Sequence, residues 1–167
     1  MLKSIDHIGN RCNDPRKAVE FYTEVLGAKF VRAVSGTKIS SGEDTPHLNV
    51  FLQLPDGSQF DFMDAPLFKP AQADPNTPPW VRHIAMRVDK REDLFEMKRR
   101  VEARGVAVDG PVERGRNTGI YFYDPFGNRL EATWSSAPLP TEETARAWDI
   151  LEQWEKRKAA GEFARED

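Results

Sequence analysis

The sequence contains a single cysteine, Cys12, among its 167 residues, and it has no long hydrophobic run. One cysteine can form neither an intrachain disulfide nor a cysteine-based zinc site, and such sparing use is typical of a reducing compartment. No apolar stretch approaches the roughly 18 residues of a membrane-spanning helix, and the opening residues lack the hydrophobic region of a signal peptide. We therefore expect a cytoplasmic protein that does not bind a membrane.

An excess of positive charge is also missing. The chain has 24 Lys and Arg residues against 27 Asp and Glu residues, which gives a formal net charge of −3. Nucleic-acid-binding proteins usually carry a basic excess, so we expect no nucleic-acid partner. With 39% hydrophobic and 10% aromatic residues, the chain can form a core. Its length fits one domain, or two small halves that share a core.

Two parts of the chain resemble each other. Ile-Asp-His-Ile at 5–8 and Val-Arg-His-Ile at 81–84 each alternate like a strand and precede a helical pattern. The cap and stop residues predict one helix between Asp14 and Gly27 and a second from about Arg91 to Arg104, with Gly105 as its stop. Three short strand candidates, separated by turn residues, follow each helix. We predict an α+β fold of two βαβββ modules that pack together, because one module cannot bury its own sheet face.

The predicted segments follow from changes in composition along the chain. They are a first module at 1–64, a proline-rich linker at 65–80, a second module at 81–135 and a C-terminal helical extension at 136–167. Trp148, Leu151 and Trp154 form one stripe of the extension. We expect this stripe to dock on the body of the protein or on a second chain, and we expect a homodimer.

Histidine and carboxylate residues occupy equivalent places in the two copies. Asp61 lies 54 residues after His7, and Glu131 lies 48 residues after His83. Strand alternation directs all four side chains to the face that points away from the helices. If the modules are related by a pseudo-twofold axis, these groups converge. Imidazole and carboxylate donors then predict a site for one divalent ion (Fe, Mn, Ni, Co or Zn), although the shorter side chain of Asp61 leaves its reach open.

The strand predicted around residues 47–53 has two contrasting sides. Leu48, Val50 and Leu52 should cover the helices. The other side carries His47, Asn49, Phe51 and Gln53. A fully solvated face would show Lys, Glu and Thr, so this mixture predicts the wall of a cavity that binds a small substrate.

Several runs resemble the vicinal oxygen chelate superfamily, which contains glyoxalase I, extradiol dioxygenases, fosfomycin-resistance enzymes and bleomycin-binding proteins. They are Asp-His-Ile-Gly at 6–9, the helix at 18–27, Arg-His-Ile-Ala at 82–85, and the run from Ile120 to Glu131. The resemblance covers residues 1–134. It implies paired modules whose sheets curl around a metal cleft. It also implies metal ligands at His7, His83 and Glu131, with the fourth glyoxalase-type position at Asp61.

Two chemistries remain open for such a site. In Lewis-acid lyase or isomerase chemistry, the metal chelates two adjacent substrate oxygens while Glu131 or Asp61 relays a proton. In Fe(II) extradiol ring cleavage, Tyr121 matches the tyrosine of the family signature. The signature histidine upstream of that tyrosine is absent here. The family's other acid–base histidine also has no match around Gln59; His47 could substitute for it functionally, although it lies on a different strand. Lewis-acid chemistry is therefore favoured narrowly.

Two further members of the superfamily suggest other contacts. Fosfomycin-type transferases use cationic side chains beside the metal, for which Arg116 is the candidate in a loop flanked by Gly115 and Gly119. Bleomycin-resistance-type proteins bind flat ligands between aromatic rings, a role open to Trp80, Phe51 and Tyr123. Those binding proteins generally lack the two histidines and the glutamate that are present here, so this third hypothesis ranks last.

Overall fold

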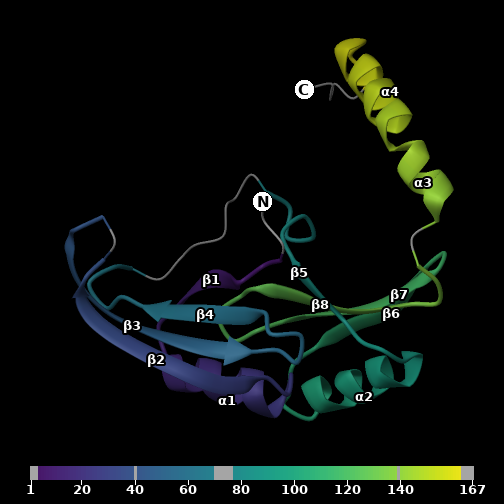
Figure 1. Ribbon diagram of the computed structural model, residues 1–167. Coiled ribbons are helices and arrows are strands. Elements are labelled where there is room, and N and C mark those ends of the chain that lie inside the picture. The colour runs from purple at the N-terminus through teal and green to yellow at the C-terminus, as the bar shows by residue number, and fades with distance from the viewer. Residues whose placement is uncertain (1–3, 40, 70–76, 139, 163–167) are drawn as a thin grey trace. The chain divides into compact units, whose positions relative to one another are not determined.

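The computed structural model describes residues 4–39, 41–69, 77–138 and 140–162 (Figure 1). It divides into two compact units, Met1–Trp134 and Ser135–Asp167. The first unit contains both βαβββ modules, and the second contains the C-terminal helices. Part of the predicted linker, residues 70–76, lies outside the described residues.

The first module forms a four-stranded sheet with one helix. Its elements are β1 (His7–Cys12), α1 (Pro15–Glu24), β2 (Lys29–Lys38), β3 (Asp44–Gln53) and β4 (Gln59–Asp64). The strand order is β1-β4-β3-β2, in which β1 runs parallel to β4 and the other neighbours are antiparallel. The Asp14 carboxylate caps α1 by accepting a hydrogen bond from the backbone N–H of Lys17 at 3.0 Å.

The second module repeats this order. Its elements are β5 (Ile84–Arg87), α2 (Arg91–Glu102), β6 (Val108–Arg114), β7 (Asn117–Tyr123) and β8 (Arg129–Ser135). The strand order is β5-β8-β7-β6, again with a parallel pair, β5 and β8, at one edge. The predicted α+β fold of two βαβββ modules is therefore confirmed. His83 directly precedes β5, and the loop predicted between Gly115 and Gly119 is instead a turn at Gly115 and Arg116 followed by the start of β7.

The C-terminal unit contains α3 (Thr141–Ala145) and α4 (Ala147–Ala159), where the sequence predicted one continuous helix from Thr141. Trp148, Leu151 and Trp154 lie in α4 and are exposed. Among the described residues, none of the helices has both the length and the apolar character needed to cross a membrane.

The two modules share one hydrophobic core. Helices α1 and α2 lie on the same side of the strands (Figure 1), and alternate strand residues pack beneath them. Core members from both modules include Tyr22, Phe60, Phe62, Ile120, Phe122 and Leu130. Phe51 and Tyr121 are also buried, at 7% and 5% exposure, but they lie outside this core. Alternation therefore separates a helix-covered face from a second face, as the sequence predicted.

A buried hydrogen bond joins the modules. The Tyr22 hydroxyl of α1 donates to Oδ2 of Asp124 at 3.0 Å, although the two residues are 102 positions apart. Asp124 also accepts hydrogen bonds from the backbone N–H groups of Phe126 and Asn128, which closes the turn between β7 and β8. One carboxylate thus fixes both the turn and its contact with α1.

Candidate functional site: two histidine–carboxylate half-sites

The first module places four of the predicted residues on one face of its sheet. Phe51 of β3 lies opposite Asp61 of β4 in the strand register, so the two side chains share a face. The Asn49 amide donates to both carboxylate oxygens of Asp61, at 2.8 and 2.9 Å. The His7 ring makes an edge contact with the ring of Phe51, with 6.3 Å between centroids. We call His7, Asn49, Phe51 and Asp61 the first half-site.

The second module places three predicted residues in the equivalent position. His83 Nε2 lies 3.2 Å from Oε2 of Glu131. The Tyr121 hydroxyl donates to the other carboxylate oxygen, Oε1, at 3.0 Å. Ala85 lies opposite Glu131 in the register of β5 and β8, which puts the carboxylate near the edge strand that His83 precedes. We call His83, Tyr121 and Glu131 the second half-site.

The two half-sites repeat the same geometry. The His83 and Tyr121 ring centroids are 6.3 Å apart with an interplanar angle of 78°, and those of His7 and Phe51 are 6.3 Å apart at 81°. The carboxylates differ in their partners. Asp61 is hydrogen-bonded to an amide, whereas Glu131 faces an imidazole. The second half-site therefore offers a paired nitrogen and oxygen donor that the first does not.

Gly119 creates the space that Glu131 occupies. A Cβ atom at Gly119 would lie 2.8 Å from Glu131 Oε1 and 3.4 Å from the Tyr121 hydroxyl. The sequence predicted a loop at Gly119, but the residue lies within β7. Gly119 precedes Glu131 by 12 residues, and Asn49 precedes Asp61 by the same number. Comparison of these two positions in the repeat could have revealed its role.

Tyr121 is a neutral hydrogen-bond donor in this arrangement. Burial raises the pKa of its hydroxyl above the usual value near 10, and the hydrogen bond to Glu131 adds to the rise. Arg114 and Arg129 oppose this effect through their positive charge. The hydroxyl therefore keeps its proton at neutral pH. It holds Oε1 of Glu131 and leaves Oε2 directed to His83.

The other predicted contacts are spread along the same strands. The His47 Nδ1 atom lies 2.8 Å from the Thr45 carbonyl oxygen, and its ring passes over Gly36 of β2. Gln53 ends β3, where its amide donates to the Gly57 carbonyl at 3.3 Å. Arg116 is half-buried in the turn between β6 and β7, and Tyr123 is exposed at the end of β7.

Arginine side chains that the sequence pattern did not single out surround the half-site aromatics. Arg129 and Arg114 lie near the Tyr121 ring, and Arg32 lies over Phe51. Arg129 stands two residues before Glu131 on β8, so strand alternation would have placed it on the same face. The positions of Arg114 and Arg32 could be predicted only if the strand register were known, and the sequence does not specify that register.

The donor types fit a divalent metal, but one chain does not gather all of them. Neighbouring donors at about 2.1 Å from one ion lie roughly 3 Å apart, which agrees with the separation of His83 and Glu131. Over residues 4–39, 41–69, 77–138 and 140–162, no three His, Cys, Asp or Glu side chains lie close enough to hold an ion. Of the four predicted ligands, His83 and Glu131 lie together, whereas His7 Nδ1 lies 2.8 Å from Asp6 Oδ2 and Asp61 is held by Asn49.

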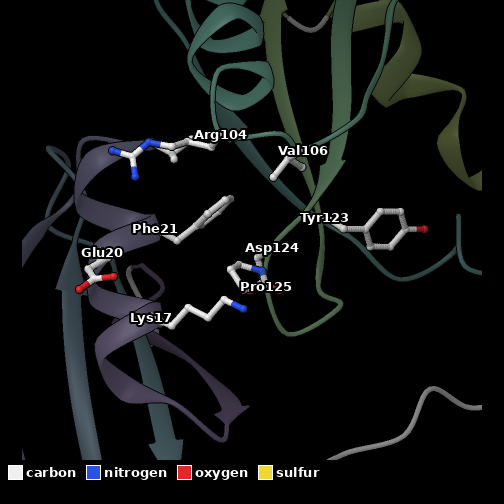
Figure 2. Close-up of a pocket in the computed structure, with 9 residues that line it drawn as sticks. Lys17, Glu20, Phe21, Arg104, Val106, Tyr123, Asp124 and Pro125 are labelled. Carbon is white, nitrogen blue, oxygen red and sulfur yellow. The ribbon is translucent and has the colours of Figure 1, made fainter.

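A cavity of about 380 Å³ lies elsewhere, beside α1 (Figure 2). It is lined by Lys17, Glu20, Phe21, Val25, Arg104, Val106, Tyr123, Asp124 and Pro125. The Asp124 carboxylate is already held by Tyr22 and the β7–β8 turn, and Arg104 pairs with Glu24. The Tyr123 ring extends away from the other lining residues (Figure 2). None of the predicted metal ligands lines this cavity.

Solved structures share the fold. A glyoxylase/bleomycin resistance protein/dioxygenase domain from Frankia sp. EAN1pec matches with a TM-score of 0.66 and 22% identity, over 81% of this chain and 99% of that one. The fosfomycin resistance protein FosX from Listeria monocytogenes, a mutant of which was solved with Mn(II) and dihydroxypropylphosphonic acid, matches with a TM-score of 0.58 and 20% identity, over 83% and 96%. At these identities the likeness concerns the fold alone.

Comparison of the sequence with known proteins identifies a relative and a family. A putative ring-cleaving dioxygenase, MhqA, from Bacillus subtilis (strain 168) is 29% identical over 136 residues, which cover 79% of this chain and 40% of that protein. The chain thus spans about two fifths of the length of this curated relative. The family model described as "Glyoxalase/Bleomycin resistance protein/Dioxygenase superfamily" matches residues 4–132. Together with the paired βαβββ modules, this match shows that the chain belongs to the glyoxalase/bleomycin resistance protein/dioxygenase superfamily.

Proposed function

We propose that this protein is a divalent-metal-dependent enzyme that binds a small substrate through two adjacent oxygen atoms and performs Lewis-acid lyase or isomerase chemistry. The observation that carries the proposal is the 3.2 Å approach of His83 Nε2 to Glu131 Oε2 on a sheet face that points away from the core. Glu131 is 13% exposed and His83 is 33% exposed, so both donors are sheltered yet accessible. Such a pair is suited to Fe, Mn, Ni, Co or Zn.

The proposed ligands are His83 and Glu131 of one chain and His7 of a second copy. His7 occupies the position in the first half-site that His83 occupies in the second, and its side chain is 47% exposed. It is not gathered with the other donors in the described part of a single chain. A homodimer that sets the first half-site of one copy against the second half-site of the other would supply the third ligand.

Each nearby side chain then has a defined task. A bound divalent cation supplies the Lewis acid that polarises the substrate oxygens. Tyr121 holds Glu131 Oε1, which keeps Oε2 available as a donor. The Asp61 carboxylate is oriented by Asn49 and is proposed as the group that accepts and returns a substrate proton. Phe51, Gln53, Arg116 and Tyr123 are the proposed substrate contacts.

Metal binding tests this proposal directly. We expect Mn(II), Ni(II) or Co(II) to bind at about one ion per chain, measured by calorimetry on the full chain. His83→Ala, Glu131→Ala and His7→Ala should each weaken binding by at least about a hundredfold, because each removes a ligand. Glu20→Gln on α1 is the matched control and should bind normally. Retention of full affinity in His83→Ala would contradict the proposal.

A second candidate, Fe(II) extradiol ring cleavage, is favoured by the names of two relatives. Besides MhqA, a 78-residue stretch is 29% identical to biphenyl-2,3-diol 1,2-dioxygenase 2 of Rhodococcus globerulus. His47 is the available acid–base histidine in this case. A panel of catechols with anaerobically loaded Fe(II) and then O2 should give no yellow ring-fission product under the leading proposal. Turnover with Fe(II) and O2 but not with Ni(II) or Co(II) would establish the second candidate instead.

A further inference from the structure

Two guanidinium groups flank the aromatic ring of the second half-site. The Cζ atom of Arg129, from β8, lies 4.3 Å from the Tyr121 ring centroid, and that of Arg114, from β6, lies 5.7 Å from it. The hydroxyl of the same ring donates to Glu131. Both positive charges are therefore held close to the proposed metal donors by cation–π contact.

Neither guanidinium has a carboxylate partner within the described residues. Other arginines do pair with acids: Arg91 Nη2 lies 2.6 Å from Glu113 and Arg99 Nη2 lies 2.5 Å from Glu96. Arg129 has only a long contact, 3.5 Å, from Nη1 to the Trp80 carbonyl oxygen. Arg129 is half-buried, so water solvates its charge less completely than the charge of an exposed arginine. Within the described residues, the half-buried Arg129 and the exposed Arg114 thus place two positive charges beside the candidate site with no paired carboxylate.

The first half-site has the same feature. The Cζ atom of Arg32, on β2, lies 4.0 Å from the Phe51 ring centroid, and Arg32 lies opposite Phe51 in the strand register. No acidic side chain of the described residues pairs with Arg32 either. The whole chain has a net charge of −3, so this positive charge is local to the half-site face. Three guanidinium groups then surround the two aromatic rings that contact His7 and His83.

We propose that the substrate carries an anionic group, a carboxylate, phosphate or phosphonate, that is bound by Arg114 and Arg129 beside Glu131. This inference rests on the proposed function and specifies its substrate class. A guanidinium presents paired N–H donors that match the oxygens of such anions. A divalent cation bound at Glu131 would add further positive charge, so the cation and the two arginines would attract the same anionic group.

Three probes with one ring and different head groups test the inference: phenylphosphonate, benzoate and neutral benzyl alcohol. Each is titrated into the full chain by NMR, with and without Mn(II). We expect at least one anion to bind about tenfold more tightly than benzyl alcohol. Its affinity should fall as NaCl rises from about 20 to about 200 mM, because salt screens exposed charges. Comparison of phenylphosphonate with benzoate distinguishes the two anion chemistries.

Arg129→Gln and Arg114→Gln should each weaken anion binding by about three- to tenfold, and they should leave benzyl alcohol binding unchanged. Arg99→Gln on α2 is the matched control and should behave as wild type. Equal affinity for the anions and benzyl alcohol, or anion binding unchanged in both variants, would overturn the inference. Mn(II) affinity, measured separately, should stay normal in both variants. Loss of metal binding in the wild type with arginine-dependent anion binding retained would refute the proposed function alone.

Discussion

At the scale of single residues, the two half-sites differ at one equivalent position, which is Asn49 in the first module and Gly119 in the second. Asn49 and Gly119 each stand 12 residues before the carboxylate of their module. The Asn49 amide engages both oxygens of Asp61, so that carboxylate is held within its own sheet. Gly119 has no side chain, and Glu131 uses the space to approach Tyr121 and His83. The first half-site therefore holds a buried carboxylate, whereas the second brings a carboxylate and an imidazole together.

Gly119→Ala tests this account. The added methyl group would meet Glu131 Oε1 at 2.8 Å, so the carboxylate must move away from Tyr121. We expect Mn(II) affinity to fall by about tenfold or more. Gly9→Ala, on β1, is the control, since a methyl group added there would have no neighbouring atom within 4 Å. Calorimetric Mn(II) titration of the two variants should separate them, and equal affinities would argue against a placed Glu131.

Cys12 gives a prediction about pH. The thiol is 2% exposed, and burial raises its pKa from 9.0 to about 11. Because the folded state favours the protonated thiol, its stabilising contribution is complete below pH 9 and is lost as the pH rises through 11. We expect the stability difference between wild type and Cys12→Ala to shrink by roughly 2 kcal/mol over this interval. Urea unfolding at several pH values measures this difference in stability. Tyr22 also has a raised pKa, but it is present in both proteins, so its contribution to the difference cancels. Parallel pH profiles would show that the Cys12 thiol does not have this raised pKa.

The sequence predicted which face each half-site residue occupies, but not its partner. Alternation is sufficient to put Asp61 and Glu131 opposite the core. The partner depends on neighbouring strands and on the space between them, as Asn49 and Gly119 illustrate. The arginines over Tyr121 and Phe51 were missed for the same reason, because their placement depends on strand register.

At the scale of elements, the turn that precedes each carboxylate-bearing strand differs between modules. Asp56 before β4 is exposed, and its carboxylate accepts hydrogen bonds from the backbone N–H and the hydroxyl of Ser58. Asp124 before β8 is buried and adds the hydrogen bond from Tyr22. The sequence predicted both turns and both modules. It could not predict the Tyr22 contact, because the two residues meet only when the modules pack.

Replacement of these turn residues should reveal the difference. Asp124→Ala leaves the N–H groups of Phe126 and Asn128 and the Tyr22 hydroxyl without their acceptor, so we expect a loss of about 3 kcal/mol in the free energy of unfolding. Tyr22→Phe removes the inter-module hydrogen bond alone and should cost about 1 kcal/mol. Asp56→Ala should leave the Tm near that of wild type. Urea unfolding and thermal melts check these values, and equal effects at both turns would contradict a special role for Asp124.

At the scale of the whole molecule, the half-sites raise the question of which chain completes each site. In the described residues, His83 and Glu131 are the only two of the four predicted donors of one chain that lie together, although the modules share one core. The Tyr22–Asp124 hydrogen bond and the shared core fix the modules against each other through their helix-covered faces. A second copy could complete the site with both modules and these contacts intact.

Mixed dimers distinguish the two arrangements. His7→Ala and His83→Ala chains each lack one ligand, and neither should bind Mn(II) tightly alone. If a site takes His7 from one copy and His83 with Glu131 from the other, a mixed dimer contains one intact site. Co-refolding the two variants in equal amounts should then restore about one quarter of the wild-type sites. His83→Ala mixed with Glu131→Ala is the control. Each site takes both His83 and Glu131 from the same copy, so every site in this mixture lacks one of the two ligands. If the site instead forms within one chain, the first mixture recovers nothing, and calorimetric site counts would show both mixtures to be equally inactive.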